Sequence, residues 1–347
     1  MRNHLRRARS LRFISPPRGP TPRGPSEPTP VIETQELTKF YADRRAVGPL
    51  SVSIAQGEIV GLLGLNGAGK TTTLRMLAGD LLPSSGRVLI DGVDIVEHPE
   101  AVRARIGYLP DVPPLYDEMT VREQLVFAAR LRGISRADAP RLAAEAELAT
   151  ELGAVQGDRI GTLSHGFRQR AGIAQAIVHG PSLLVLDEPI SGLDPVQIVE
   201  MRRLLLRLRG RHTTIVSSHI LSEISETCDR ILVIRDGEVV AAGTEAELSA
   251  RLVQGVRFDV AVRGDRAAAT AAIEAVAGVV RVEPRDGGES APGVTALRVE
   301  ADRDAREDVC RALVGAGLGV LELARHDREL ESVFLRLAGR DRDGAAS

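Results

Sequence analysis

The sequence is poor in cysteine and in long apolar runs. Its two cysteines, Cys228 and Cys310, show none of the paired spacings of zinc sites or disulfide frameworks, which fits a reducing cytosol. No apolar run approaches the ~18 residues that a membrane-spanning helix requires. From the sequence we therefore expect a soluble protein with no membrane segment of its own.

Lysine is also rare, because all but two of the 45 basic residues are arginine. The two lysines are Lys39 and Lys70. In a chain that otherwise uses arginine, a lysine has arisen by neutral drift or stands at a site that does not accept the bulky, planar guanidinium group. Residues 1–30 hold seven Arg and one Glu, which leaves a charge of about −8 on the other 317 residues. This acidic part lacks the basic face of a nucleic-acid-binding protein, so we expect no nucleic-acid partner.

Length and composition predict two domains between two tails. At ~150 residues per domain, 347 residues suggest about two domains. Residues 1–30 are rich in Pro and Arg and cannot build a core, so we expect a disordered tail there. An organelle transit peptide and a start codon assigned too early are the alternatives. Residues 341–347 are predicted to form a second disordered tail.

Residues 31–250 alternate apolar, β-rich runs with amphipathic helical runs, which predicts an α/β domain with a largely parallel core. The run LLVLD is apolar without alternation, as expected for a strand that is covered on both faces. The candidate strands are EIVGLLG, RVLIDG, LLVLD, TTIVSS, RILVIRDG and EVVAAG, and the helical runs include VREQLVFAARLRG and PVQIVEMRRLLLRLRG.

Residues 255–340 show a different order of elements. Strand and helix patterns follow one another as βαββαβ, which predicts a small ferredoxin-like α+β domain. A last helix is expected over ELESVFLRLAG, with Leu330, Val333, Phe334 and Leu337 on one face for packing in a core or between domains.

The segment GLNGAGKT, residues 64–71, follows a predicted strand and precedes the helical run TTTLRMLAG. It satisfies G-x-x-x-x-G-K-[ST] in the required context of strand, loop and helix. Glycines let backbone N–H groups turn toward phosphate oxygens where side chains would clash. Lys70 would reach the β- and γ-phosphates, and the hydroxyl of Thr71 would bind magnesium. The predicted nucleotide-binding residues here are Gly64, Leu65, Asn66, Gly67, Ala68, Gly69, Lys70, Thr71 and Thr72.

Two carboxylates and a histidine follow predicted strands. Asp187 ends the strand of LLVLDEP, where it can hold magnesium through water at the carboxyl edge of the sheet. Glu188 leaves the strand in another direction, so we assign it to orienting or activating an attacking water. His219 follows the strand TTIVSS at the same edge and is predicted to contact the γ-phosphate.

The segment LSHGFRQR, residues 163–170, opens a helical run. Ser164 is a typical helix N-cap, and the free N–H groups of a helix start can bind an anion. Taken alone, such a segment is far more often a simple helix cap than an anion-binding site.

Together these segments resemble the ATPase subunits of ABC transporters over roughly residues 31–250. The elements occur in the family's order: Tyr41, the phosphate loop, IGYLPD, LSHGFRQR, LLVLDEP, SGLDP and SSHIL. The resemblance implies a P-loop NTPase fold of the ABC ATPase type with a helical subdomain, and ATP and Mg²⁺ as cofactors. It also implies that Tyr41 stacks on adenine.

The resemblance further implies a second ATPase subunit. In this family the segment that LSHGFRQR resembles binds the γ-phosphate of ATP held by the partner of a head-to-tail dimer, through Ser164 and Gly166. Asp194 in SGLDP would lie at the dimer contact. Because one chain carries every element of the site, we expect a homodimer with two equal sites.

Three positions depart from the family pattern. His165 and Phe167 stand where the family generally has glycine and glutamine, and Asp111 ends IGYLPD where the family generally has glutamine. An aspartate keeps an oxygen ligand but adds negative charge. We therefore predict Thr71, Asp111 and Asp187 as metal-binding residues, with an altered dependence on magnesium.

The resemblance implies an ATP-binding and ATP-hydrolysing subunit that powers a separate multi-span permease from the cytoplasmic face of the cell membrane. The segments IGYLPDVPPLYDEMTV, SSHILSE and ESVFLRL resemble those of export systems most. Helical residues near Leu115 to Leu125 are our candidates for the docking groove of the permease.

Two alternatives remain open at this point. One is a soluble ABC ATPase that acts on ribosomes or nucleic acid, although the chain lacks the long insertions or the second ATPase domain of such relatives. The other is a regulator whose C-terminal domain binds a small ligand.

Overall fold

The computed structural model describes residues 30–252, 256–285 and 293–325. The two predicted tails, apart from Pro30, and the predicted last helix over residues 329–339 lie outside the described residues.

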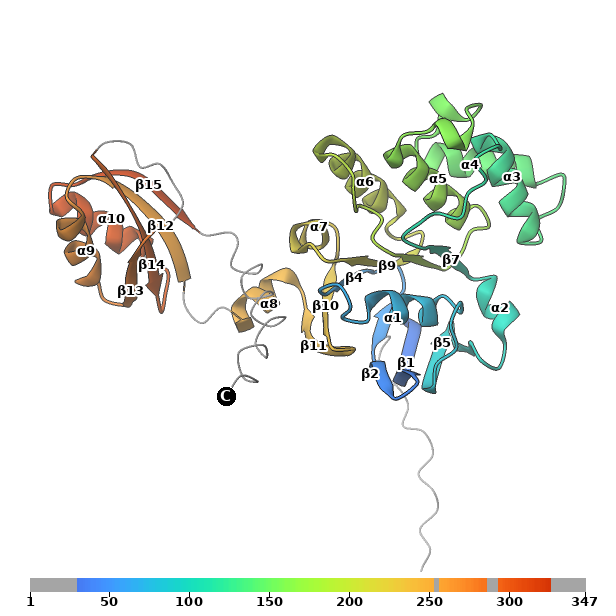
Figure 1. The fold of residues 1–347 in the computed structure, drawn as a ribbon, viewed down its shortest axis with the longest axis horizontal. Helices are drawn as coiled ribbons and strands as arrows, with labels where there is room; N and C mark the ends of the chain where they lie inside the picture. Colours follow the sequence, from blue (N-terminus) through green and yellow to red (C-terminus); the bar gives the residue numbers. More distant parts are fainter. Residues whose placement is uncertain (1–29, 253–255, 286–292, 326–347) are drawn as a thin grey trace, which may run out of the picture.

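A six-stranded sheet forms the centre of residues 30–252 (Figure 1), in the order β11-β10-β4-β9-β8-β7. Every neighbouring pair from β10 to β7 is parallel, and β11 adds an antiparallel edge strand. The predicted, largely parallel core is therefore confirmed. The strands are β4 (Ile59–Leu63), β7 (Ile106–Leu109), β8 (Leu183–Leu186), β9 (Thr213–Ser218), β10 (Arg230–Arg235) and β11 (Glu238–Gly243).

A second, antiparallel sheet packs beside the first. It has the order β2-β1-β5-β6, with β3 paired to β1. The predicted strand RVLIDG belongs to this sheet and not to the parallel core: it forms β5 and pairs antiparallel with β1, Ile90 opposite Ile32. The strands of this sheet are β1 (Pro30–Tyr41), β2 (Arg44–Leu50), β3 (Ser53–Ala55), β5 (Ser85–Ile90) and β6 (Val93–Asp94).

Two hydrophobic cores lie on the two faces of the central sheet. Along β4, Ile59 and Leu63 join one core, and Val60 and Leu62 join the other. Adjacent strand residues point to opposite faces, so a strand buried on both sides must be apolar throughout. One core includes residues of α5 and α6, and the other includes α1 and the antiparallel sheet.

Eight α-helices and two short 3₁₀ helices are described within residues 30–252. Figure 1 shows α3 and α4 beside α5, above the end of the sheet at β7. These three helices contact one another and form the predicted helical subdomain. The α-helices are α1 (Lys70–Leu77), α2 (Pro99–Arg103), α3 (Val121–Leu131), α4 (Ala139–Ala149), α5 (His165–Ile177), α6 (Pro195–Leu208), α7 (Leu221–Ser225) and α8 (Glu245–Leu252).

The expectation of a helix from Leu115 was wrong. Residues 111–120 contain bends, one turn and an irregular stretch but no helix, and α3 begins only at Val121. Thr120 is its N-cap, and its side chain and that of Glu123 form a capping box. Such a box satisfies free N–H groups of the first turn and fixes where a helix starts.

Residues 256–285 and 293–325 form a separate unit with its own core. The element order is the expected βαββαβ, and the antiparallel sheet has the order β13-β14-β12-β15. Along β14 every second residue is buried, so one face of the sheet packs on α9 and α10 around Phe258. The elements are β12 (Val256–Arg263), α9 (Arg266–Glu274), β13 (Val279–Pro284), β14 (Val294–Ala301), α10 (Arg306–Gly315) and β15 (Gly319–Arg325).

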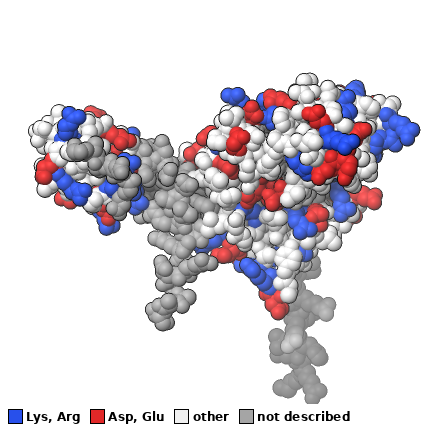
Figure 2. Space-filling view, turned by 45° about the horizontal axis from the view of Figure 1, so that its top comes forward, with Lys and Arg blue, Asp and Glu red and all other residues white. Residues whose placement is uncertain are grey.

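The surface carries charges of both signs. On the face drawn in Figure 2, basic and acidic side chains are interspersed over both units. In the described part of the chain, no helix has the length and apolar character to cross a membrane.

Candidate functional site

The phosphate loop lies between the carboxyl end of β4 and the start of α1. Gly67 and Gly69 have φ angles of 83° and 103°, which side chains disfavour, and Gly69 is the N-cap of α1. A Cβ on Gly64 would lie 2.8 Å from the carbonyl oxygen of Ile234 in β10, so only glycine fits there. The loop therefore directs backbone N–H groups and a helix N-terminus at one point, which favours an anion.

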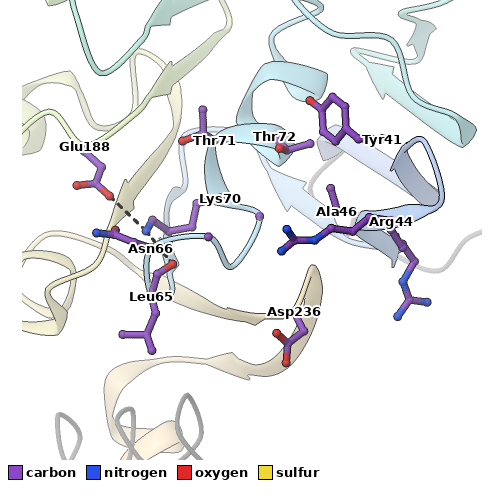
Figure 3. Close-up of a pocket in the computed structure, with 13 residues that line it drawn as sticks. Tyr41, Arg44, Ala46, Leu65, Asn66, Lys70, Thr71, Thr72, Glu188 and Asp236 are labelled. Carbon is purple, nitrogen blue, oxygen red and sulfur yellow. Dashed lines mark hydrogen bonds and ion pairs between the residues drawn. The ribbon is translucent and has the colours of Figure 1, made fainter. Parts of the chain in front are cut away.

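Lys70, the first residue of α1, is buried, with 5% of its surface exposed. Its ammonium donates to the carbonyl oxygen of Gly64 at 2.8 Å. It also lies 3.2 Å from Oε1 of Glu188, across the site from the loop (Figure 3). The ammonium group of Lys70 is thus held on the concave side of the loop, where a phosphate group would neutralise its charge.

Ser217 of β9 joins the two carboxylates that follow β8. Its hydroxyl donates to Oδ1 of Asp187 at 2.6 Å and accepts the backbone N–H of Glu188 at 2.9 Å. Burial raises the pKa of Asp187, while the hydrogen bond from Ser217 acts in the opposite direction. The other oxygen of Asp187, Oδ2, is buried and has no hydrogen-bond partner among the described residues.

The carboxylate of Glu188 lies between Lys70 and His219. Oε2 of Glu188 is 2.9 Å from Nδ1 of His219, and Oε1 faces Lys70. Glu188 has a φ angle of 47°, in the left-handed region, which costs a non-glycine residue ~1–3 kcal/mol. Such strain is typical of functional sites, and here it turns the side chain toward the phosphate loop.

A pocket of about 430 Å³ opens in front of the loop (Figure 3). Nine of its lining residues were predicted from the sequence, and Arg44, Arg45, Ala46 and Asp236 were not. The two arginines follow Tyr41 closely in the chain, so their nearness to the expected adenine-stacking residue could have predicted them as pocket residues. Asp236 lies in a β-turn, and nothing in the sequence around it predicts a place in the pocket. The predicted residues are Tyr41, Leu65, Asn66, Gly67, Gly69, Lys70, Thr71, Thr72 and Glu188.

Tyr41 lies at the rim of this pocket. It ends β1, is 47% exposed, and has the ammonium of Lys39 5.6 Å from the centre of its ring. Gly64 and Ala68 belong to the loop without lining the pocket, and the carbonyl oxygen of Ala68 accepts the N–H of Gly237. The exposed ring leaves a flat aromatic surface beside the phosphate loop.

Ser164 and Gly166 lie at the start of α5, away from this pocket. Ser164 is the N-cap, and its hydroxyl accepts the N–H of Phe167 at 3.4 Å. Gly166 is buried against Gln197 of α6, and a Cβ there would lie 2.9 Å from Cδ of Gln197. Neither residue is among the described residues that line the pocket, so within one chain the structure does not bring them to Lys70.

Asp111 follows β7 and is exposed. Its negative charge contributes to raising the pKa of Asp187, and its carbonyl oxygen faces Nε2 of Gln169 at 3.5 Å. The described residues contain no group of three or more His, Cys, Asp or Glu side chains that could hold a metal ion. The buried, unpartnered Oδ2 of Asp187 is an oxygen ligand of the kind that Mg²⁺ takes, since this ion binds one or two carboxylates and completes its shell with water and phosphate.

Comparison with known proteins agrees with this geometry. Residues 47–191 match the family described as "ABC transporter". The chain is 34% identical over 314 residues to the bacitracin transport ATP-binding protein BcrA of Bacillus licheniformis, covering 89% of this chain and 97% of that protein. It is 35% identical over 320 residues to the daunorubicin/doxorubicin resistance ATP-binding protein DrrA of Streptomyces peucetius, covering 92% and 95%.

Solved structures show the same fold. The ATP-binding subunit of an ABC transporter matches with a TM-score of 0.57 and 31% identity, over 64% of this chain and 92% of that one. The cbiO1 protein of Clostridium perfringens, part of the ABC transporter complex cbiONQ, matches with a TM-score of 0.58 and 28% identity, over 65% and 94%. The fold and site thus define a P-loop ATPase of the ABC type.

The chain belongs to the ATP-binding proteins of ABC transporters. It is a subunit that binds and hydrolyses ATP, and a separate permease uses the released free energy for transport.

Proposed function

We propose that this protein is the ATPase of an export system, acting as a homodimer at the cytoplasmic face of the cell membrane. The observation that carries the proposal is the carboxylate of Glu188 held between Lys70 and His219 at the mouth of the phosphate loop. Relatives named for bacitracin transport and for daunorubicin or linearmycin resistance support the direction of export.

The nucleotide would bind with its phosphates in the loop and its base at Tyr41. Backbone N–H groups of residues 64–72 and the ammonium of Lys70 meet the phosphate charge, and the exposed ring of Tyr41 offers a stacking surface for adenine. ATP then replaces Glu188 as the anion that faces Lys70, since both anions compete for one buried ammonium.

Three residues would hold Mg²⁺. The hydroxyl of Thr71 follows Lys70 in the loop, the unpaired Oδ2 of Asp187 supplies a buried oxygen, and the carboxylate of Asp111 supplies an exposed one. The bound ion would neutralise phosphate charge. Asp111 adds one negative charge relative to glutamine, so Asp111→Gln should change the magnesium concentration needed for half-maximal ATPase activity.

Hydrolysis requires a water molecule placed against the γ-phosphate. Once ATP has replaced it at Lys70, the carboxylate of Glu188, still held by His219, would orient that water. His219 would hold Glu188 on one side and contact the γ-phosphate on the other. Phosphoryl transfer needs little more than such positioning and charge stabilisation.

A second copy of the chain would complete the site. Ser164 and Gly166 lie apart from Lys70 within one chain, and the N-terminus of α5 is a suitable partner for a phosphate held by another chain. Residues 31–250 would form this ATPase domain, residues 255–340 would form an accessory domain, and the two ends would be tails.

The permease would dock on the segment before α3. Val112 and Tyr116 are 76% and 53% exposed, and the ring of Tyr116 packs edge-on against Phe127 of α3, with 5.7 Å between ring centres. An apolar surface of this kind on the helical subdomain fits a membrane-protein partner.

The test is a pull-down of the tagged chain from gently solubilised native membranes, with co-purifying proteins identified by mass spectrometry. We expect a stoichiometric multi-span protein. The double variant Val112→Asp, Tyr116→Asp should lose this protein and keep its ATPase activity. Leu148→Asp is the matched control, because Leu148 is 80% exposed at the end of α4 in the same subdomain.

The competing function is an ABC ATPase that acts on ribosomes or nucleic acid. Recovery of the tagged chain with ribosomes or DNA, and without a membrane protein, would contradict the transporter proposal. The interspersed charges in Figure 2 and the transporter names of the relatives favour the permease as partner.

A further inference from the structure

The turn that follows Glu188 is held by α5 of the same chain. His165, the first residue of α5, has Nε2 3.1 Å from the carbonyl oxygen of Ser191. Since a carbonyl oxygen only accepts hydrogen bonds, Nε2 of His165 carries a hydrogen and donates it. Glycine, the residue that the family generally has at this position, has no side chain to make this bond.

Ser191 is in turn bonded to Glu188. The N–H of Ser191 donates to the carbonyl oxygen of Glu188 at 3.1 Å and closes a turn that begins at the carboxylate residue. The φ angle of 47° at Glu188 is unfavourable for a side chain, so contacts from the surroundings must maintain it. His165 is one of these contacts, two hydrogen bonds away from Glu188.

A second contact joins the start of α5 to the start of α6. Gly166, next in α5, packs directly on Gln197 near the start of α6. Gln197 belongs to a capping box with Asp194, whose side chain accepts the N–H groups of Val196 and Gln197. The start of α5 therefore contacts Ser191 at the beginning of the loop of residues 191–194 and Gln197 in the helix that follows the loop.

We propose that His165 is a positioning residue that links the start of α5 to Glu188 of the same chain through Ser191. This inference rests on the proposed dimer, in which Ser164 at the same helix start meets the ATP of the partner. A shift of α5 on closing over the partner's nucleotide is then transmitted to the carboxylate that serves the chain's own nucleotide. The two ATP sites are thereby coupled through a residue that does not touch the chain's own ATP.

Mixed dimers separate this role from a direct contact with the partner's nucleotide. In the first arrangement, a His165→Leu subunit is paired with a Glu188→Gln subunit, so that hydrolysis depends on Glu188 of the chain that carries the leucine. In the second, a subunit with both changes is paired with a wild-type subunit. Hydrolysis then depends on Glu188 of the wild-type subunit, and the leucine lies in α5 of the other subunit, which faces that site across the dimer.

We expect kcat to fall about fivefold in the first arrangement, the factor that one hydrogen bond of ordinary net strength represents, with KM for ATP unchanged. The second arrangement should stay near the wild-type rate per active site. His165→Gln should restore most of the loss, because its amide N–H reaches a similar position. His98→Leu, at an exposed histidine ahead of α2, is the control and should leave kcat unchanged.

A loss confined to the second arrangement would overturn the inference, because His165 would then act on the partner's nucleotide. Full activity in the first arrangement would overturn it as well. Sedimentation of the Glu188→Gln chain in the presence of ATP tests the proposed dimer separately. If this chain stays monomeric, the two chains share no ATP site, and both the proposed dimer and the coupling are refuted.

Discussion

Removing the hydroxyl of Ser217 should lower both stability and ATPase activity, although Ser217 is not itself predicted to bind ATP or magnesium. Ser217→Ala deletes the donor to Oδ1 of Asp187 and the acceptor for the N–H of Glu188. At ~1 kcal/mol net for each bond, and more where the partner is charged, we expect a loss of about 2–3 kcal/mol in the free energy of unfolding. The ATPase kcat should fall as well, because Glu188 loses one of the contacts that hold its backbone.

The assay is denaturant unfolding of the nucleotide-free protein, together with steady-state hydrolysis. Thr214→Val is the matched control, because Thr214 lies on the same strand and its buried hydroxyl has no hydrogen-bond partner in the described part of the chain. It should cost little stability. If Ser217→Ala proves no more damaging than Thr214→Val, the bridging role of Ser217 is refuted.

Three further outcomes follow from burial and close packing. Burial raises the pKa of Asp187 above its ordinary 3.8, so its charge destabilises the folded chain at neutral pH. Asp187→Asn should therefore raise the Tm at pH 7 without magnesium, by a margin that closes as the pH falls toward 3.8, and a margin independent of pH would contradict this. Burial lowers the pKa of His179 from 6.5 to about 4, so stability should fall as the pH drops through this window, by up to ~3 kcal/mol at ~1.4 kcal/mol per pKa unit. In acid unfolding curves, the stability of His179→Gln should fall less than that of the wild type as the pH drops. An equal fall in both proteins would show that other groups cause the acid sensitivity. Gly64→Ala places Cβ 2.8 Å from the backbone oxygen of Ile234. Overpacking of this kind costs ~1–3 kcal/mol, so the ATP affinity measured by calorimetry should drop about tenfold or more. An affinity equal to that of the wild type would show that the loop adapts to the extra methyl group.

Local patterns predicted that residues 64–69 form a loop between a strand and a helix, and this loop lies between β4 and α1. Gly67, Gly69 and Lys70 stand within four residues, and their chemistry depends on backbone angles and charge that a short segment determines by itself. The apolar runs also revealed the parallel strands, because a strand covered on both faces has few polar residues.

Contacts between distant segments could not be predicted in this way. Ser217 meets Asp187 from a strand 30 residues further along the chain, and His165 meets Ser191 across 26 residues. An apolar run such as β5 indicates a strand but not the sheet that it joins. The late start of α3 was readable, since the spacing of Thr120 and Glu123 matches a capping box.

The measurement that tests the account most directly compares ATP binding and ATP hydrolysis in Glu188→Gln and the wild-type chain. The amide keeps the shape of the side chain and removes the charge that faces Lys70. We predict ATP binding at least as tight as in the wild type, with hydrolysis slowed by ~10²–10⁴-fold, the usual contribution of a positioned general base. Retention of most of the turnover by Glu188→Gln would contradict the central role assigned to this carboxylate.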